Sequence, residues 1–276
     1  MQSAAVLWYS QTGHSFRLAS IAGDALKGMG INARVENLRR ETGSLPDENL
    51  MVFAFPVFNW SLPWPVRDFI AAMPRTEKRK SALLILTMGG WAANTPYLFK
   101  KALAEKNIEL ANFVTVRCRD SYIPFAKWLP FMDKQELPNQ ESFSSVRAFI
   151  EASLGEKRQR RQARFNPFDP MHWMGAATPK DGPLLFMGPR RFLQDQCTGC
   201  GFCQTMCPAG AIEGERRDLS WNREKCIGCC GCINICPENA WRLVRFSPDC
   251  YDKGLDVPQM VAKLKKKNSA KGEKQG

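Results

Sequence analysis

Short apolar runs alternate with longer amphipathic stretches over the first 154 residues. The apolar runs have strand length and lie at residues 4–9, 31–37, 50–55, 81–87 and 110–117. Helical periodicity predicts helices over residues 14–29, 64–73, 94–107 and 140–153. Alternation of this kind is typical of βα units around a parallel sheet. The helix between the second and third strands is predicted to be short or missing.

The alternating pattern ends near Gly155. A basic run at residues 157–164 is followed by a stretch rich in Pro, Gly and aromatic residues, and we predict an ordered linker over residues 155–192. Six apolar residues make this linker too hydrophobic for a free coil, so we expect them to pack between domains. They are Phe165, Phe168, Trp173, Leu184, Leu185 and Phe186. Residues 251–276 form a basic tail, predicted to be disordered from Lys263 onward.

Length and cysteine distribution narrow the class of protein. A chain of 276 residues predicts two domains. No stretch is apolar for long enough to span a bilayer, so the sequence favours a soluble, cytoplasmic protein. Ten of the eleven cysteines lie between Cys197 and Cys250, whereas Cys118 stands alone. Such crowding indicates metal binding in a reducing compartment and disfavours a disulfide scaffold.

Two cysteine runs repeat with a spacing of 29 residues. The first run is Cys197, Cys200, Cys203 and Cys207, followed by Pro208, and the second begins at Cys226. Thiolates are the soft ligands of iron–sulfur clusters, and two residues between successive cysteines let one loop bind three irons of a cube. A pair of structural zinc sites is the alternative, but zinc has no use for the third cysteine or for the Cys-Pro ending.

Residues 193–246 resemble the dicluster bacterial ferredoxins, and we expect a small α+β ferredoxin-like domain over residues 193–250. The resemblance implies two 4Fe-4S clusters whose fourth ligands are exchanged between the runs. The implied ligands are Cys197, Cys200, Cys203 and Cys236 for the first cluster, and Cys207, Cys226, Cys229 and Cys232 for the second. Cys118, Cys230 and Cys250 are surplus, and we expect buried, unreactive thiols there.

A hydroxyl-rich loop follows the first predicted strand and opens directly into a helix. Its residues Ser10, Thr12, Gly13, His14 and Ser15 suit a phosphate cradle, because hydroxyls, a close backbone approach and a helix N-terminus all favour an anion. A simple helix cap is the competing interpretation. The His14 side chain is expected either to donate to the phosphate or to be solvated in the first turn of the helix.

Loops after the third and fourth strands complete the pattern. Pro56, Phe58, Asn59 and Trp60 follow the third strand, and Gly89, Gly90 and Trp91 follow the fourth. Ligands of open α/β sheets bind at this edge. Together the three loops resemble the flavodoxin family over residues 1–154.

The flavodoxin resemblance implies a doubly wound sheet of five parallel strands that binds FMN. The FMN phosphate would lie on the first loop and the flavin ring between the other two. Trp60 or Phe58 would stack on the ring, while groups around Asn59, Gly89 and Gly90 would bond its polar edge. Trp91 is open to either stacking or ordinary packing.

The whole chain is similar to the fusions of flavodoxin and ferredoxin found in anaerobes. The resemblance implies electron transfer between two clusters, which carry one electron each, and FMN, which carries two. The alternative is an FMN-dependent reductase of a quinone, nitro compound or metal ion, fed by its own clusters. The long segment 120–138 is expected to pack against the ferredoxin module, or else to cover a satellite core.

The net charge of +12 is concentrated in two segments. Residues 155–192 carry eight basic and three acidic residues, and residues 251–276 carry seven and three. These segments favour an acidic redox partner, an anionic membrane face or simple solvation. Nucleic acid is disfavoured, because no recognition motif accompanies the charge.

Overall fold

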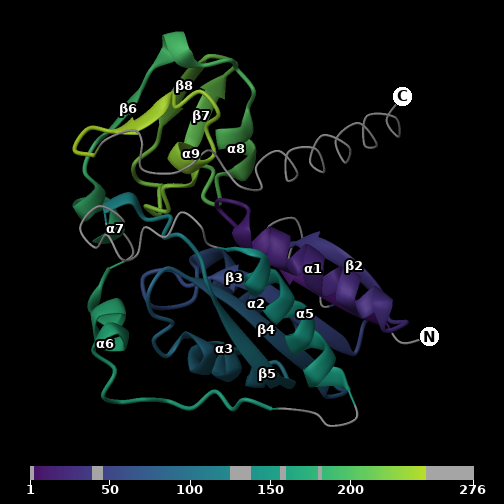
Figure 1. Ribbon diagram of the computed structural model, residues 1–276. Helices are drawn as coiled ribbons and strands as arrows, with labels where there is room; N and C mark the ends of the chain where they lie inside the picture. The colour runs from purple at the N-terminus through teal and green to yellow at the C-terminus, as the bar shows by residue number, and fades with distance from the viewer. Residues whose placement is uncertain (1–2, 39–45, 125–137, 156–159, 180–181, 247–276) are drawn as a thin grey trace. The chain divides into compact units, whose positions relative to one another are not determined.

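The computed structural model describes residues 3–38, 46–124, 138–155, 160–179 and 182–246 (Figure 1). Of these residues, 3–10, 15–120 and 138–179 fall in one compact unit, and 11–14, 121–124 and 182–246 fall in a second. We call them unit 1 and unit 2. The predicted disordered tail and most of the segment 125–138 lie outside the described residues.

Unit 1 is built on a sheet of five parallel strands. They are β1 (Ser3–Trp8), β2 (Asn32–Asn37), β3 (Leu50–Pro56), β4 (Lys80–Met88) and β5 (Ile108–Arg117), in the order β2-β1-β3-β4-β5 (Figure 1). This is the flavodoxin-like order, in which the chain reverses direction across the sheet between β1 and β3. The predicted doubly wound fold is confirmed, and every predicted strand is present.

Four helices of unit 1 match the predicted ones. They are α1 (His14–Gly28), α2 (Trp64–Ala72), α3 (Thr95–Ala104) and α5 (Gln140–Leu154). The start of α5 shows why the sequence marks a boundary there: Asn139 accepts a hydrogen bond from the Ser142 amide, and the Ser142 hydroxyl accepts one from the Asn139 amide. This capping box satisfies two amide groups that a helix start leaves free.

Strand residues alternate between two buried faces of the sheet, because side chains in a strand point to opposite sides. Phe53 and Phe55 of β3 face α3, where both rings meet Phe99 edge-on with centroids 5.1 and 5.0 Å away. Trp8 of β1 faces the other way and packs its ring 4.6 Å from Phe16 of α1. Helices therefore cover both faces, which explains why the strands read as continuous apolar runs.

Residues 160–179, part of the segment predicted as a linker, pack on unit 1. Asn94 holds the backbone of Asn166 by two hydrogen bonds, from Nδ2 to the carbonyl at 2.9 Å and from the amide to Oδ1 at 2.8 Å. Ala163 is buried in the core, and Phe165 lies against the Tyr97 ring. A helix, α6 (Pro170–Ala177), follows, with its start capped by Asp169.

Leu184 is buried in the core of unit 2 itself, so its packing between domains stays a prediction. The expected packing is wrong for Phe168 and Trp173, which are 89% and 54% exposed, and for Leu185 and Phe186, which are also exposed. Helix α6, which contains Trp173, buries none of its residues, and α7 buries Leu184 and Met187 while Leu185 and Phe186 lie on its exposed side.

Unit 2 has two small antiparallel sheets among short helices. Its elements are α7 (Gly182–Met187), β6 (Arg190–Phe192), η3 (Gln194–Gln196), α8 (Phe202–Met206), β7 (Ile212–Glu215), β8 (Asp218–Trp221), α9 (Gly231–Asn234) and β9 (Trp241–Leu243). Strand β6 pairs with β9, and β7 pairs with β8 (Figure 1). In the sequence, the 29-residue repeat makes β6 equivalent to β8 and β7 equivalent to β9. Unit 2 therefore consists of two related halves, and its α+β arrangement is as predicted.

The segment after β5 enters unit 2. Asn234 Nδ2 donates to the Ser121 carbonyl at 2.7 Å, and the Tyr122 hydroxyl donates to the Pro183 carbonyl at 2.6 Å. Ile123 is buried in the core of unit 2. The expectation that segment 120–138 packs against the cysteine-rich module is therefore confirmed for residues 121–124.

Candidate cofactor sites

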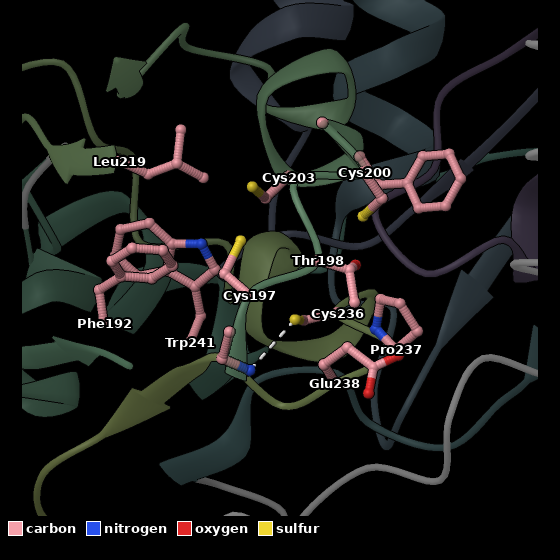
Figure 2. Close-up of a pocket in the computed structure, with 13 residues that line it drawn as sticks. Phe192, Cys197, Thr198, Cys200, Cys203, Leu219, Cys236, Pro237, Glu238 and Trp241 are labelled. Atoms are coloured by element: carbon pink, nitrogen blue, oxygen red, sulfur yellow. Dashed lines mark hydrogen bonds between the residues drawn. The ribbon is translucent and has the colours of Figure 1, made fainter. Parts of the chain in front are cut away.

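Four cysteines surround one cavity in unit 2. Cys197, Cys200 and Cys203 come from the first run, and Cys236 is the last cysteine of the second run. Figure 2 shows their sulfur atoms around a common space. The wall is completed by apolar residues, among them Phe192, Leu219 and Trp241. The fold thus brings together the four residues predicted for the first cluster.

The second predicted set is buried in the other half of unit 2. Cys226, Cys229 and Cys232 are each 8% exposed. Burial raises the pKa of the Cys232 thiol to about 11, and repulsion from Cys226 and from Cys207 adds to the rise. Cys207, the last cysteine of the first run, is thus one of the thiols that act electrostatically on Cys232.

The thiols of the first set are affected by both sets. Burial raises the pKa of the Cys203 thiol to about 12, and charge repulsion from Cys232, Cys236 and Cys200 contributes. A neutral thiol is costly to ionise at such a site, so a cationic metal centre is needed to hold four thiolates together there. The cavity that gathers Cys236 with Cys197, Cys200 and Cys203 is the observation that favours crossed sharing of the fourth cysteines between the two runs.

Backbone amides point at four of the sulfur atoms. The amides of Ala211 and Ala240 donate to Cys207 Sγ at 3.1 Å and Cys236 Sγ at 3.2 Å (Figure 2 shows the second bond). The amides of Gly199 and Gly228 donate to Cys197 Sγ and Cys226 Sγ, both at 3.4 Å. Both glycines have positive φ, of 73° and 71°, which turns these amides toward the sulfur atoms. Amide donors of this kind stabilise thiolates.

Buried donors beside the cysteines test whether an iron–sulfur cluster fits. Trp221 Nε1 and Arg190 Nε are buried and have no hydrogen-bond partner among the described residues. Trp241 Nε1 likewise makes no hydrogen bond of good geometry in the described part of the chain, although it lies near enough to Cys203 to oppose the rise in the pKa of that thiol. Buried donors require acceptors, and inorganic sulfide is one. The residues fit the cluster.

None of the described cysteines forms a disulfide. Within the described residues, no three Cys, His, Asp or Glu side chains converge as ligands of a single metal ion. The surplus Cys118 and Cys230 are buried, as expected, and Cys250 lies outside the described residues. Cys230 has φ of 55°, and its Sγ lies 3.3 Å from Met187 Sδ. The first run has Gly201 at the matching position, with φ of 72°.

The hydroxyl-rich loop of residues 10–15 has the backbone expected of a phosphate cradle. Gly13 has φ of 101°, and α1 begins at the next residue. Ser10 and Thr12 are buried, and the Ser15 hydroxyl lies 2.9 Å from the Thr87 hydroxyl at the end of β4. His14 is only 3% exposed, so the expectation of a solvated first-turn side chain is wrong.

The loop after β3 forms a tight turn. Phe58 and Ser61 exchange two backbone hydrogen bonds of 3.0 Å, and the two residues between them, Asn59 and Trp60, have φ of 49° and 53°. Two consecutive positive φ angles define a type I′ turn. The Phe58 ring is buried against Trp64, with centroids 5.0 Å apart, whereas Trp60 is half-buried.

Helix α6 packs directly on this turn. A Cβ atom on Gly175 would lie 2.5 Å from the Asn59 carbonyl oxygen and 3.3 Å from Trp60 Cβ. Only a glycine allows such an approach. The role of Gly175 is invisible in the sequence, because the contact joins residues more than one hundred positions apart.

The loop after β4 is held from one side. A Cβ atom on Gly89 would lie 2.5 Å from the Asp120 carboxylate, so Asp120 packs closely on this glycine. Gly90 and Pro56 are half-buried, and Trp91 is 48% exposed. Strands β1, β3 and β4 are neighbours in the sheet, and their carboxyl ends lie at one edge.

The described part of the chain has no helix long and apolar enough to cross a membrane.

The chain was compared with known proteins. Residues 191–237 match the family model of the 4Fe-4S dicluster domain. No curated protein shows significant similarity to the chain. Similar solved structures include a flavodoxin from the domain Archaea, at 12% identity over 54% of this chain and 94% of that chain, with a TM-score of 0.38.

Flavodoxin 2 from Bacillus cereus is similar at 11% identity, over 54% of this chain and 96% of that chain, with a TM-score of 0.43. An azoreductase from Bacillus anthracis is similar at 11% identity, over 54% and 99%, with a TM-score of 0.40. The strand order of unit 1 and the family match in unit 2 lead to one conclusion. The chain is a fusion of a flavodoxin-like α/β fold with a 4Fe-4S dicluster domain.

Proposed function

We propose that the protein transfers electrons between two 4Fe-4S clusters in unit 2 and FMN bound by unit 1. When bound, the clusters exchange single electrons, and the flavin accepts two in separate steps. The observation that carries the proposal is the gathering of Cys197, Cys200, Cys203 and Cys236 around one cavity in a chain that also has a flavodoxin-like sheet.

The proposed ligands follow the crossed pattern. Cys236 completes the set of Cys197, Cys200 and Cys203, and Cys207 completes that of Cys226, Cys229 and Cys232. The cavity lined by Cys197, Cys200, Cys203 and Cys236 supports this division, because it leaves Cys207 for the thiols of the second run. The largely apolar wall around the first set strengthens the electrostatic influence of the amide donors there.

The proposed flavin site uses the edge formed by the ends of β1, β3 and β4. Ser10, Thr12, Gly13, His14 and Ser15 bind the phosphate, since the loop turns at Gly13 directly into the start of α1. The ring lies between the other two loops, which contribute Pro56, Phe58, Asn59 and Trp60 from one side and Gly89 and Gly90 from the other.

Trp60 is the proposed stacking residue, because the Phe58 ring already packs against Trp64. The type I′ turn supports this role by placing Asn59 and Trp60 at its tip, between the paired residues Phe58 and Ser61. Backbone groups around such a tip are suited to the polar edge of a flavin.

Cofactor analysis of protein purified without oxygen tests the proposal. About eight irons, eight sulfides and one FMN per chain are expected from the ligand count. A content of about four irons, or the absence of flavin after reconstitution with FMN, contradicts it. A turnover screen with quinones, nitro compounds and metal ions distinguishes an electron carrier from a reductase, since the carrier shows no saturable turnover with small acceptors.

The redox partner is proposed to be an acidic protein. The basic residues of segment 155–192 support this, and Arg160, Arg161 and Arg164 in it are exposed. Electrostatic attraction between such surfaces is screened by salt. Raising the ionic strength is therefore expected to slow reduction by an acidic ferredoxin, and a rate independent of salt contradicts this choice of partner.

A further inference from the structure

The two cysteine sites of unit 2 differ in one charged side chain, that of the half-buried Arg190. The 29-residue repeat equates Arg190 on β6 with Leu219 on β8, and Phe192 with Trp221. Leu219 and Phe192 line the cavity of the first cysteine set (Figure 2). The equivalent wall of the second set therefore holds an arginine in place of a leucine.

Contacts of Arg190 confirm this location. Its Nη1 donates to Cys232 Sγ at 3.5 Å, and its Nη2 lies 3.6 Å from Met187 Sδ. The guanidinium carbon lies 4.8 Å from the centre of the Trp221 ring, a cation–π distance. Sulfur and an aromatic face hold the cation on both sides, and among the described residues no carboxylate forms an ion pair with it.

The guanidinium remains charged in this environment. A guanidinium is not deprotonated in proteins, so Arg190 carries its positive charge beside the Cys232 sulfur. A half-buried cation without a carboxylate partner is stabilised by negative charge nearby. The thiolates and the cluster of the second set supply that charge.

We propose that Arg190 selectively stabilises the reduced form of the cluster bound by Cys207, Cys226, Cys229 and Cys232, and so makes it the higher-potential cluster of the pair. The inference rests on the proposed ligand sets. Adding one electron makes the cluster more negative by one charge, and Arg190 compensates this charge without taking up a proton. Leu219 provides no such compensation in the first site. Through its charge beside Cys232, Arg190 thus favours reduction of this cluster before the other one.

A redox titration of the holoprotein, followed by electron spin resonance, tests this directly. Arg190→Leu copies the wall of the first site into the second. It is expected to lower the higher of the two midpoint potentials and to narrow their separation, with about a tenfold loss in the reduced-to-oxidised ratio of that cluster at a fixed potential. Arg191→Leu is the matched control, because it removes the same charge from an exposed neighbour on β6. It is expected to leave both midpoints in place.

Two conservative variants keep the proposal testable if Arg190→Leu does not fold. Arg190→Lys keeps the charge and is expected to retain the separation, while Arg190→Gln is expected to lose it. Equal behaviour of these two variants, or a shift of both midpoints together, overturns the role of Arg190. Iron and sulfide are measured on every sample. Fewer than two clusters in the wild-type protein would refute the proposed ligand sets, whereas two clusters that are insensitive to Arg190 refute only the inference.

Discussion

Exchange of the fourth cysteines can be tested by combining substitutions. Cys236→Ala removes the ligand that the second run contributes to the cavity of Cys197, Cys200 and Cys203. The iron content is expected to fall from about eight to about four per chain, because only one ligand set is damaged. Cys207→Ala is expected to have the same effect on the other set.

Double variants reveal which cysteines share a cluster. Cys236→Ala combined with Cys197→Ala damages one site twice, so about four irons are expected to remain. Cys236→Ala combined with Cys226→Ala damages both sites, and about zero irons are expected. Two substitutions in the same cluster site do not add their losses of iron, whereas substitutions in two independent sites do. Iron and sulfide analysis on gel-filtered, anaerobic protein measures the difference.

The control is Cys230→Ala, which removes a buried thiol outside both proposed sets and is expected to retain about eight irons. The reasoning is refuted if the pattern reverses, so that Cys236 and Cys226 behave as one site. It is equally refuted if any single substitution among the eight ligands leaves the iron content unchanged.

Three further predictions concern unit 1. Lys80→Met should cost about 2–4 kcal/mol in the urea unfolding of unit 1, because the buried ammonium donates to three carbonyls of residues 46–48. Burial alone would raise the pKa of Glu48, but the hydrogen bond from Arg34 lowers it. This stabilisation is present above the unfolded pKa of Glu48 and is lost as pH falls through the folded value, so Glu48→Gln should flatten the acid side of the stability profile. Gly175→Val should clash with the Asn59 carbonyl and weaken FMN binding about tenfold in a fluorescence titration, whereas unchanged binding would exclude this contact from the site.

Much of unit 1 could be predicted because its strands are buried on both faces. The run at residues 50–55 lies within β3, Leu50–Pro56, and the helix predicted at residues 140–153 is α5, Gln140–Leu154. Apolar runs and capping residues are local signals. The packing of residues 160–179 on the rest of unit 1 depends on residues far apart in the sequence. Asn94 and Asn166, for example, are hydrogen-bonded although they are 72 positions apart.

The cysteine sites show the same division between local and distant information. The spacing of Cys197, Cys200 and Cys203 identifies the ligand type directly. Arg190 was missed because it lies in the predicted linker, outside any motif. A signal was available: the 29-residue repeat extends back to the aromatic pair Phe192 and Trp221, and it places Arg190 opposite Leu219. Its half-buried position and its contact with sulfur appear only in the fold.

Electron exchange within one chain is the central claim. Rapid mixing of the oxidised holoprotein with a limiting one-electron reductant, followed by absorbance at wavelengths specific for clusters and flavin, measures it directly. We predict fast cluster reduction, then flavin reduction in a first-order phase whose rate is independent of protein concentration. A flavin that stays oxidised while the clusters are reduced, or that is reduced only at a rate proportional to protein concentration, would contradict the account.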